Sequence, residues 1–351
     1  MAKQIIDRDR MESLRNELGF NDPGIFEKSV YAFNLLSEVV KCYPGLVFKG
    51  GTSLLFHIFP PARLSIDIDI LLPVAEKEGL SARLTRMVRD SKWFAGIEED
   101  VRKGKNIPKA HFKFPFMSHF SKIQQYVLLD VVFTEAPYGK LLQKDIAVNP
   151  MALAGSGGMV NVPTVEGLFG DKLTAISPKT MGIPLAPDRT MEFMKQIIDL
   201  GEIFKLVDDV AEVNRSFLNT VRVENGFRSS THSGEDVFND IEQIAFRYSQ
   251  ALLRGGNRAF EEIELLNDGN TKVANHLRVK LSPEEIKIAF ARIVYVISVL
   301  RRGATGRLVK RVDMNSIKGR VFSERYRILD RLKAAVPEAY FYWVLAVGVK
   351  G

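Results

Sequence analysis

The chain has 351 residues, 46% hydrophobic and 26% charged, which is typical of a globular protein with room for two domains. Its single cysteine, Cys42, and its scattered histidines exclude an intrachain disulfide and a cysteine-based zinc site. No apolar run approaches the roughly 18 residues of a membrane helix, and the N-terminus lacks a signal-peptide core. We therefore expect a protein of the reducing cytoplasm without a membrane partner, in which oxygen ligands would hold any metal, as they hold Mg²⁺ or Mn²⁺.

The net charge is +7, and it is unevenly placed. The segment from Arg301 to Lys333 contains eleven basic and three acidic residues, so its net charge of +8 accounts for the excess of the whole chain. Such a segment can bind the phosphates of a nucleic acid, or it can be an ordinary solvated surface. The charge pattern leaves both interpretations open.

The first part of the chain mixes helical and strand patterns. Periodicity predicts helices over 1–43, 52–59 and 78–91, and strands over Leu46–Phe48, Ile66–Leu72 and Tyr126–Phe133. Gly50 and Gly51 separate the first strand from the second helix, and Pro60-Pro61 ends that helix.

The best candidate for a domain boundary is the glycine-rich stretch Gly155-Ser156-Gly157-Gly158. The chain after it is mainly helical. Helices are expected over 164–176, 191–206, 236–254 and 283–302, with a polar loop over 224–235. The sequence therefore predicts an α+β fold, with a mixed sheet and flanking helices over residues 1–158 and a helical domain over 159–351.

Two aspartates, Asp67 and Asp69, alternate with isoleucines on the strand over 66–72. Residues two apart on a strand point to the same side, so the carboxylates share one face and the isoleucines share the other. Adjacent carboxylates repel each other, and a divalent cation with hard oxygen ligands would offset that repulsion. The alternative is a half-exposed strand with a polar outer face.

Upstream of this strand, a strand enters the turn Gly50-Gly51-Thr52-Ser53, from which a helix leaves. Glycine lets the backbone approach a ligand closely, and the free N–H groups at a helix start attract phosphate. Thr52 and Ser53 can add hydroxyl donors. Such a turn alone is usually structural, but a triphosphate with bound Mg²⁺ needs both these donors and the carboxylates.

A third acid, Asp130, lies in the otherwise apolar strand over 126–133. Burying an unpaired carboxylate is very costly, so Asp130 either faces a polar site or pairs with a cation. The alternative is a salt-bridged strand end.

The stretches Lys49-Gly-Gly-Thr-Ser-Leu54 and Arg63-Leu-Ser65-Ile-Asp67-Ile-Asp69 resemble the first motif of the AbiEii/AbiGii toxin nucleotidyltransferases. That family belongs to the DNA polymerase β-like nucleotidyltransferase superfamily. Weaker resemblances to its later motifs follow in the expected order at Gly170–Ala175, Thr180–Pro184 and Met194–Leu200. The resemblance covers residues 45–205.

The resemblance implies a role for each matching residue. Asp67 and Asp69 would be metal ligands, and Asp130 would be the third carboxylate at the metal, which helps to activate the attacking hydroxyl. Lys172 would contact the phosphates of the nucleotide, and Asp199 would be a downstream aspartate needed for activity. The nucleotide-binding residues would be Lys49, Gly50, Gly51, Thr52, Ser53, Arg63, Ser65 and Lys172.

The two later residues also have structural interpretations. Lys172 lies on the apolar side of its helix, where a lysine either extends its ammonium to solvent or meets an anion. Asp199 could pair with Lys195 across one helical turn. The long connection Pro178–Arg189 between them departs from the shorter ones of the family, and Arg189 could contribute to the site.

The resemblance implies a metal-dependent nucleotidyltransferase that uses an NTP and Mg²⁺ or Mn²⁺. It would be the toxin of a toxin–antitoxin or phage-defence system, with a cognate antitoxin as its partner. Some members of the family add nucleotides to the 3′ end of tRNA, and the basic segment 301–333 fits such an RNA acceptor.

Three alternatives remain open: transfer to a small molecule, transfer to a protein hydroxyl, and a non-catalytic nucleic-acid-binding protein on the same fold. The Asp67/Asp69 pair argues against the third, because unused paired carboxylates would only lower stability.

Overall fold

The computed structural model describes residues 7–91, 93–101, 108–153, 157–256, 260–303 and 305–348. Its internal contacts divide the chain into two compact units. The first unit ends at Thr164 and also includes Asn275–Arg278, and the second comprises Val165–Ala274 and the chain from Val279 onward. Gly155 and Ser156 of the candidate boundary lie outside the described residues.

The first unit contains a mixed sheet of seven strands in the order β3-β4-β5-β2-β1-β7-β6. The strands are β1 (Val47–Lys49), β2 (Asp67–Leu72), β3 (Glu98–Glu99), β4 (Lys109–Met117), β5 (Gln124–Phe133), β6 (Leu141–Asp145) and β7 (Met159–Pro163). The strands expected in β1, β2 and β5 are confirmed. Because β7 pairs with β1 and β6, it belongs to the sheet unit although it follows the glycine-rich stretch.

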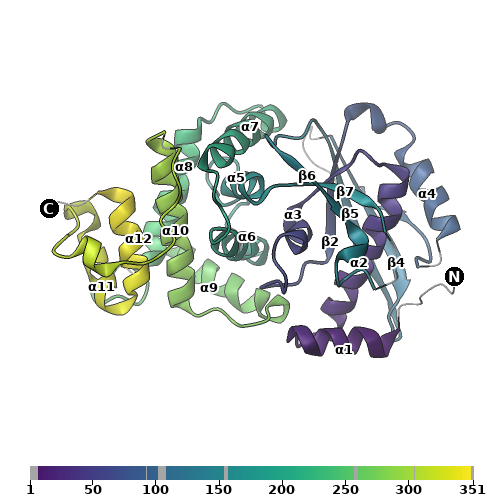
Figure 1. Cartoon of the computed structure of the whole chain (residues 1–351), viewed down its shortest axis with the longest axis horizontal. Coiled ribbons are helices and arrows are strands. Elements are labelled where there is room, and N and C mark those ends of the chain that lie inside the picture. The colour runs from purple at the N-terminus through teal and green to yellow at the C-terminus, as the bar shows by residue number, and fades with distance from the viewer. Residues whose placement is uncertain are drawn as a thin grey trace. The chain divides into compact units, whose positions relative to one another are not determined.

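Helices cover one face of this sheet (Figure 1). The expected N-terminal helix is two helices, α1 (Arg8–Leu18) and α2 (Pro23–Cys42), because Gly19 adopts φ 75° and Asp22 caps the second helix. α2 and α4 (Leu80–Asp90) contribute to a core that contains Ile68 and Ile70. The isoleucine face of β2 is therefore the core face, as the alternation predicts.

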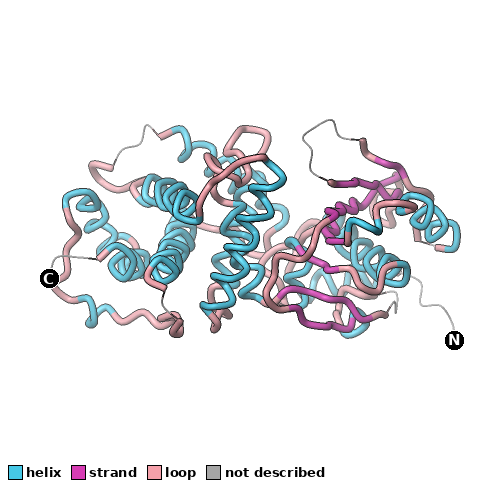
Figure 2. The backbone as a smooth tube through the Cα atoms, turned by 90° about the horizontal axis from the view of Figure 1, so that it is seen from above, coloured by secondary structure: helices cyan, strands magenta, loops and turns pink. Residues whose placement is uncertain are grey.

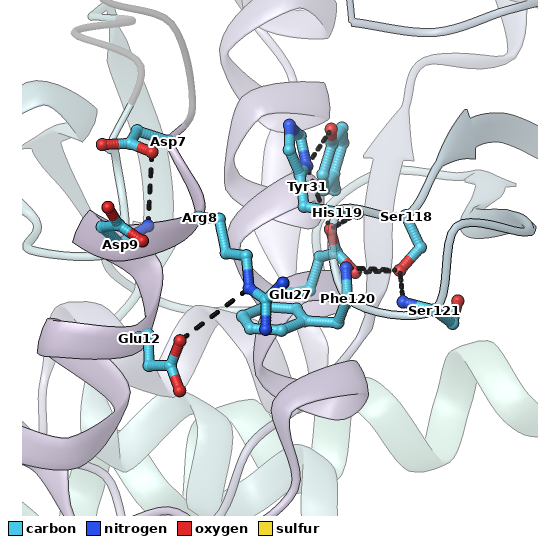
Figure 3. Close-up of polar contacts among 10 residues, drawn as sticks. All are labelled: Asp7, Arg8, Asp9, Glu12, Glu27, Tyr31, Ser118, His119, Phe120 and Ser121. Carbon is cyan, nitrogen blue, oxygen red and sulfur yellow. Dashed lines mark hydrogen bonds and ion pairs between the residues drawn. The ribbon is translucent and has the colours of Figure 1, made fainter.

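A buried carboxylate, Glu27 of α2, holds the turn between β4 and β5 (Figure 3). Its oxygens accept hydrogen bonds of 2.6 Å from both Ser118 Oγ and the His119 backbone N–H. Burial of a carboxylate is tolerable when such donors surround it. The network therefore fixes the β4–β5 hairpin to α2.

A short segment from far along the chain completes the first unit. The His276 carbonyl accepts a 2.8 Å hydrogen bond from the Leu64 N–H, and the Arg278 N–H donates to the Ala62 carbonyl at 3.0 Å. These bonds hold the chain over 62–64, directly before β2. No local sequence pattern predicts a contact across more than 200 residues.

The second unit is helical, and no strand occurs in its described part (Figure 2). Its helices are α5 (Val165–Ala175), α6 (Thr190–Ile203), α7 (Val210–Arg228), α8 (Gly234–Ser249), α9 (Glu261–Val273), α10 (Pro283–Arg301), α11 (Leu332–Ala335) and α12 (Pro337–Val347). A capping box between Ser282 and Glu285 starts α10, within one residue of the expected helix. The predicted α+β fold is thus confirmed.

The loop expected over 224–235 is wrong in its first part, because α7 continues to Arg228. Glu224 and Arg228 form an ion pair of 2.9 Å across one helical turn, which lets a polar run remain helical. The next helix ends at Ser249, earlier than the expected 254. Among the described helices, none combines the length and apolar content that a membrane crossing requires.

Candidate functional site

A row of four polar residues crosses the face of the sheet opposite the isoleucines. The Cα pairings are Lys49 with Asp69, Asp69 with Asp130, and Asp130 with His111, so the row runs over β1, β2, β5 and β4. Paired residues on adjacent strands project to the same side and lie about 4.8 Å apart along the sheet. The structure therefore brings Asp69 and Asp130, which are 61 positions apart in the sequence, next to each other.

Asp67 extends this row along β2. It is paired with Leu128 and lies two residues before Asp69, so the two aspartates are about 6.7 Å apart on one face. Both are partly exposed, whereas Ile68 and Ile70 are buried. The predicted placement of the carboxylates on a common, accessible face is confirmed.

The glycine turn packs directly against this row. Gly50 has φ 77°, in the left-handed region, and a Cβ on it would lie 2.0 Å from Asp69 Oδ2. A Cβ on Gly51 would lie 2.3 Å from Arg63 Nη2 and 3.1 Å from Ser65 Oγ. The turn, Asp69, Arg63 and Ser65 thus form one cluster, in which the two glycines have no room for a side chain.

The hydroxyls of Thr52 and Ser53 already have partners inside the turn. Thr52 Oγ1 donates to the Asp67 carbonyl at 2.5 Å, and Ser53 Oγ donates to the Gly50 carbonyl at 2.9 Å. Both residues are fully buried. They lie in α3 (Gly50–Ser53), which begins two residues before the expected helix and continues as a 3₁₀ turn only to Phe56. The hydrogen bond of Thr52 fixes the turn to β2, and that of Ser53 closes the turn itself.

Gly50→Ala is expected to reduce transfer about 100-fold, because the added methyl group displaces Asp69 and a shift of about 1 Å in a reacting group has effects of that size. The left-handed conformation should also lower stability by about 1–2 kcal/mol. The rate of transfer and thermal unfolding measure the two effects. Gly45→Ala is the matched control, since nothing lies within 4 Å of a Cβ at Gly45. Full activity of Gly50→Ala would contradict the packing role.

Asp130 has a close partner that the sequence did not suggest. His111 Nδ1 lies 2.6 Å from Asp130 Oδ1, and both side chains are partly buried. An ionised carboxylate only accepts hydrogen bonds, so His111 Nδ1 is the donor. This bond orients the Asp130 side chain. In the sequence, only the alternation of Lys109, His111 and Lys113 along β4 indicated that His111 lies on a polar strand face.

Among the described residues, no group of three or more His, Cys, Asp or Glu side chains is arranged to hold a metal ion by itself. Mg²⁺ is commonly held by one or two carboxylates, while waters and substrate phosphates complete its shell. Asp67 and Asp69 supply hard oxygen donors on one accessible face, so they fit such a partial site. One oxygen of Asp130 is already bonded to His111.

In the second unit, Lys172 of α5 and Asp199 of α6 form an ion pair of 2.8 Å. They are only 4% and 3% exposed, and Lys172 Nζ also donates to Gln196 Oε1 at 2.8 Å. The inward position predicted for Lys172 is confirmed. Arg189 is half-exposed and pairs with Glu192 at 3.0 Å, at the start of α6. The sequence singled out Lys172 and Asp199 separately, and the structure shows that they pair with each other.

Comparison with known proteins identifies one family. The family model described as "Nucleotidyl transferase AbiEii toxin, Type IV TA system" matches residues 35–278, from α2 through the segment that completes the first unit. No curated protein matches the chain.

Two solved structures from Helicobacter pylori are similar to this chain at low identity. JHP933 is 14% identical with a TM-score of 0.46, and the match covers 79% of this chain and 95% of JHP933. A candidate nucleotidyltransferase is 13% identical with a TM-score of 0.47, and the match covers 79% and 97% of the two chains. The family match spans more than half of the sequence, and the chain therefore belongs to the AbiEii family of nucleotidyltransferase toxins from type IV toxin–antitoxin systems.

Proposed function

We propose that this enzyme transfers a nucleotide from an NTP to the 3′ hydroxyl of an RNA, with tRNA as the acceptor, and that the reaction depends on Mg²⁺ or Mn²⁺. As the toxin of its system it would act in phage defence and be neutralised by its antitoxin. The observation that carries the proposal is the packing of Gly50 against Asp69, beside Asp67 and Asp130, on one accessible sheet face.

The residues of this face have separate tasks. Asp67 and Asp69 would hold the divalent cation together with the triphosphate of the NTP. A cation bound there supplies Lewis-acid activation of the attacking hydroxyl and neutralises the leaving pyrophosphate. The backbone N–H groups of the glycine turn would bind the phosphates, since the hydroxyls of Thr52 and Ser53 already donate within the protein. Arg63 and Ser65 belong to the same cluster, and Lys49 is paired with Asp69 on the adjacent strand.

The acceptor hydroxyl needs to lose a proton as its oxygen bonds to the α-phosphorus and the bond to pyrophosphate breaks. Asp130 would accept this proton through its second oxygen, because its first accepts the hydrogen bond from His111. His111 acts through Asp130 and is a positioning residue.

Lys172 would neutralise part of the phosphate charge. A lysine ammonium has three N–H donors, and two of them are directed at Asp199 and Gln196. The third would be available to a phosphate. Asp199 would then hold the ammonium in place without touching the substrate, which fits the role that the resemblance implies for it.

The acceptor assignment rests on charge. Most of the basic side chains of the segment 301–333 are exposed, among them Arg307, Arg311, Lys318, Arg320, Arg327, Arg331 and Lys333. Others are paired with acids, for example Arg301 with Glu235 and Lys310 with Asp208. Exposed Lys and Arg side chains bind the phosphate backbone without reading sequence, as the binding of many tRNAs would require.

Incubation with total tRNA, Mg²⁺ and each labelled NTP in turn tests this function. We expect label on tRNA from the wild-type protein and none with EDTA. Periodate-oxidised tRNA, which lacks a free 3′ hydroxyl, is the acceptor control and should remain unlabelled. Label on the protein or on a small molecule instead of RNA would refute the acceptor assignment while leaving the transfer chemistry in place.

A further inference from the structure

An exposed aromatic side chain lies on the same sheet face as the aspartates. Tyr126 of β5 is 45% exposed, and Met117 of β4 is 60% exposed. The pairings Pro115 with Tyr126 and Met117 with Gln124 place both side chains on one face, as diagonal neighbours. Large apolar side chains exposed side by side on a sheet offer a flat surface to a ligand.

Two lysines flank the tyrosine. Lys28 Nζ and Lys113 Nζ each lie 5.4 Å from the centre of the Tyr126 ring. Lys113 Nζ is also 4.0 Å from Asp100 Oδ1, which is the outer limit of an ion pair. Lysine side chains have flexible four-carbon stems, so both ammonium groups can move from the ring to a nearby phosphate.

The distance between Tyr126 and the aspartates follows from the spacing of residues along β5. Tyr126 precedes Asp130 by four residues on β5, so the two side chains share a face and are about 13 Å apart. Stacked nucleotides rise about 3.4 Å each along a strand. An RNA chain whose last hydroxyl lies at Asp130 would therefore place a base three to four nucleotides from its end over Tyr126.

We propose that Tyr126, Met117, Lys28 and Lys113 form a stacking platform for the unpaired 3′ end of the RNA acceptor. This inference rests on the proposed function, because Asp130 marks the end of the acceptor. An aromatic ring between cations suits single-stranded nucleic acid, since the bases stack on the ring and the phosphates contact the ammonium groups. The hairpin is held by Glu27, so the platform is rigid before RNA binds.

Binding of stem–loop RNAs to the full-length protein tests the platform. The RNAs share one stem and carry unpaired 3′ ends of zero to six nucleotides. Fluorescence anisotropy is measured in EDTA and without NTP, so that no transfer occurs. We expect the affinity to rise about tenfold as the overhang grows from none to four nucleotides and then to level off, because one stacked base contributes about that much.

Variants identify the residues responsible. Tyr126→Ala should abolish the rise with overhang length, whereas Tyr126→Phe should keep it, because the ring and not the hydroxyl stacks. Lys28→Gln and Lys113→Gln should each reduce the salt dependence of overhang binding by about 0.7 in the logarithmic slope. Leu141→Ala and Lys140→Gln are the matched controls, since both residues are exposed and lie at or beside β6, on the far edge of the sheet.

The platform would be refuted if the affinity of Tyr126→Ala rose with overhang length as much as that of the wild type. It would also be refuted if the wild-type affinity did not rise with overhang length. A loss in Tyr126→Phe as large as in Tyr126→Ala would refute it as well. Because binding is measured without NTP, it is independent of catalysis. If the wild-type protein transfers nucleotides to RNA but binds all overhangs equally, only the platform is refuted. If its affinity rises with overhang length but it transfers no nucleotide, only the proposed reaction is refuted.

Discussion

Replacing Asp67 or Asp69 by asparagine is expected to reduce nucleotidyl transfer at least about 1000-fold while the chain still folds. Metal-ion catalysis contributes several kcal/mol to the transition state, and about 4 kcal/mol corresponds to that factor. Asparagine keeps the shape of aspartate but removes the charge that holds a cation. Both side chains are partly exposed, and the hydrogen bond from Thr52 reaches the Asp67 backbone, so the strand is retained.

The measurement is the initial rate of label transfer, with thermal unfolding as the check on folding. Glu98→Gln is the matched control, because Glu98 is an exposed carboxylate on β3 of the same sheet and should tolerate the change. Transfer by Asp67→Asn and Asp69→Asn at more than a tenth of the wild-type rate would contradict the assignment of these residues.

The second large effect concerns the stability of the helical unit. Lys172→Met or Asp199→Asn is expected to destabilise it by about 3–5 kcal/mol, because each change removes one charge of a buried ion pair. Denaturant unfolding followed by circular dichroism measures this loss. Lys205→Met is the matched control, since its ion pair with Glu202 is exposed and should contribute less than about 1 kcal/mol.

The double variant Lys172→Met/Asp199→Leu separates structure from function. It removes both charges, so it should recover part of the lost stability. If Lys172 contacts a phosphate, transfer should remain impaired in the double variant. Single variants within about 1 kcal/mol of the wild type would contradict the buried pairing, and a stable, fully active double variant would leave the pair a purely structural role.

The sequence predicted the features that depend on neighbouring residues. The alternation of aspartate and isoleucine over 66–72 is a local property, and it correctly placed two carboxylates on the accessible face of β2. The glycine turn was found in the same way. Its hydrogen bonds were not, because the carbonyls that accept from the hydroxyls of Thr52 and Ser53 depend on how the turn packs against β2.

The features that the sequence missed depend on pairing between distant segments. His111 joins the site only because β4 lies beside β5 in this register. The contact of residues 275–278 with the chain before β2 spans more than 200 positions. Helices α7, α9 and α12 were overlooked as well. Neither α9 nor α12 begins with a side-chain cap, whereas Asp209 caps α7.

The most direct test of the site is the binding of Mn²⁺ to the full-length protein with and without a non-hydrolysable NTP analogue, followed by electron paramagnetic resonance. Since Asp67 and Asp69 form only part of a metal shell, we expect tight Mn²⁺ binding only when the nucleotide is present, and its loss in Asp67→Asn/Asp69→Asn. Tight nucleotide-dependent binding that survives in this double variant would place the metal elsewhere and contradict the account.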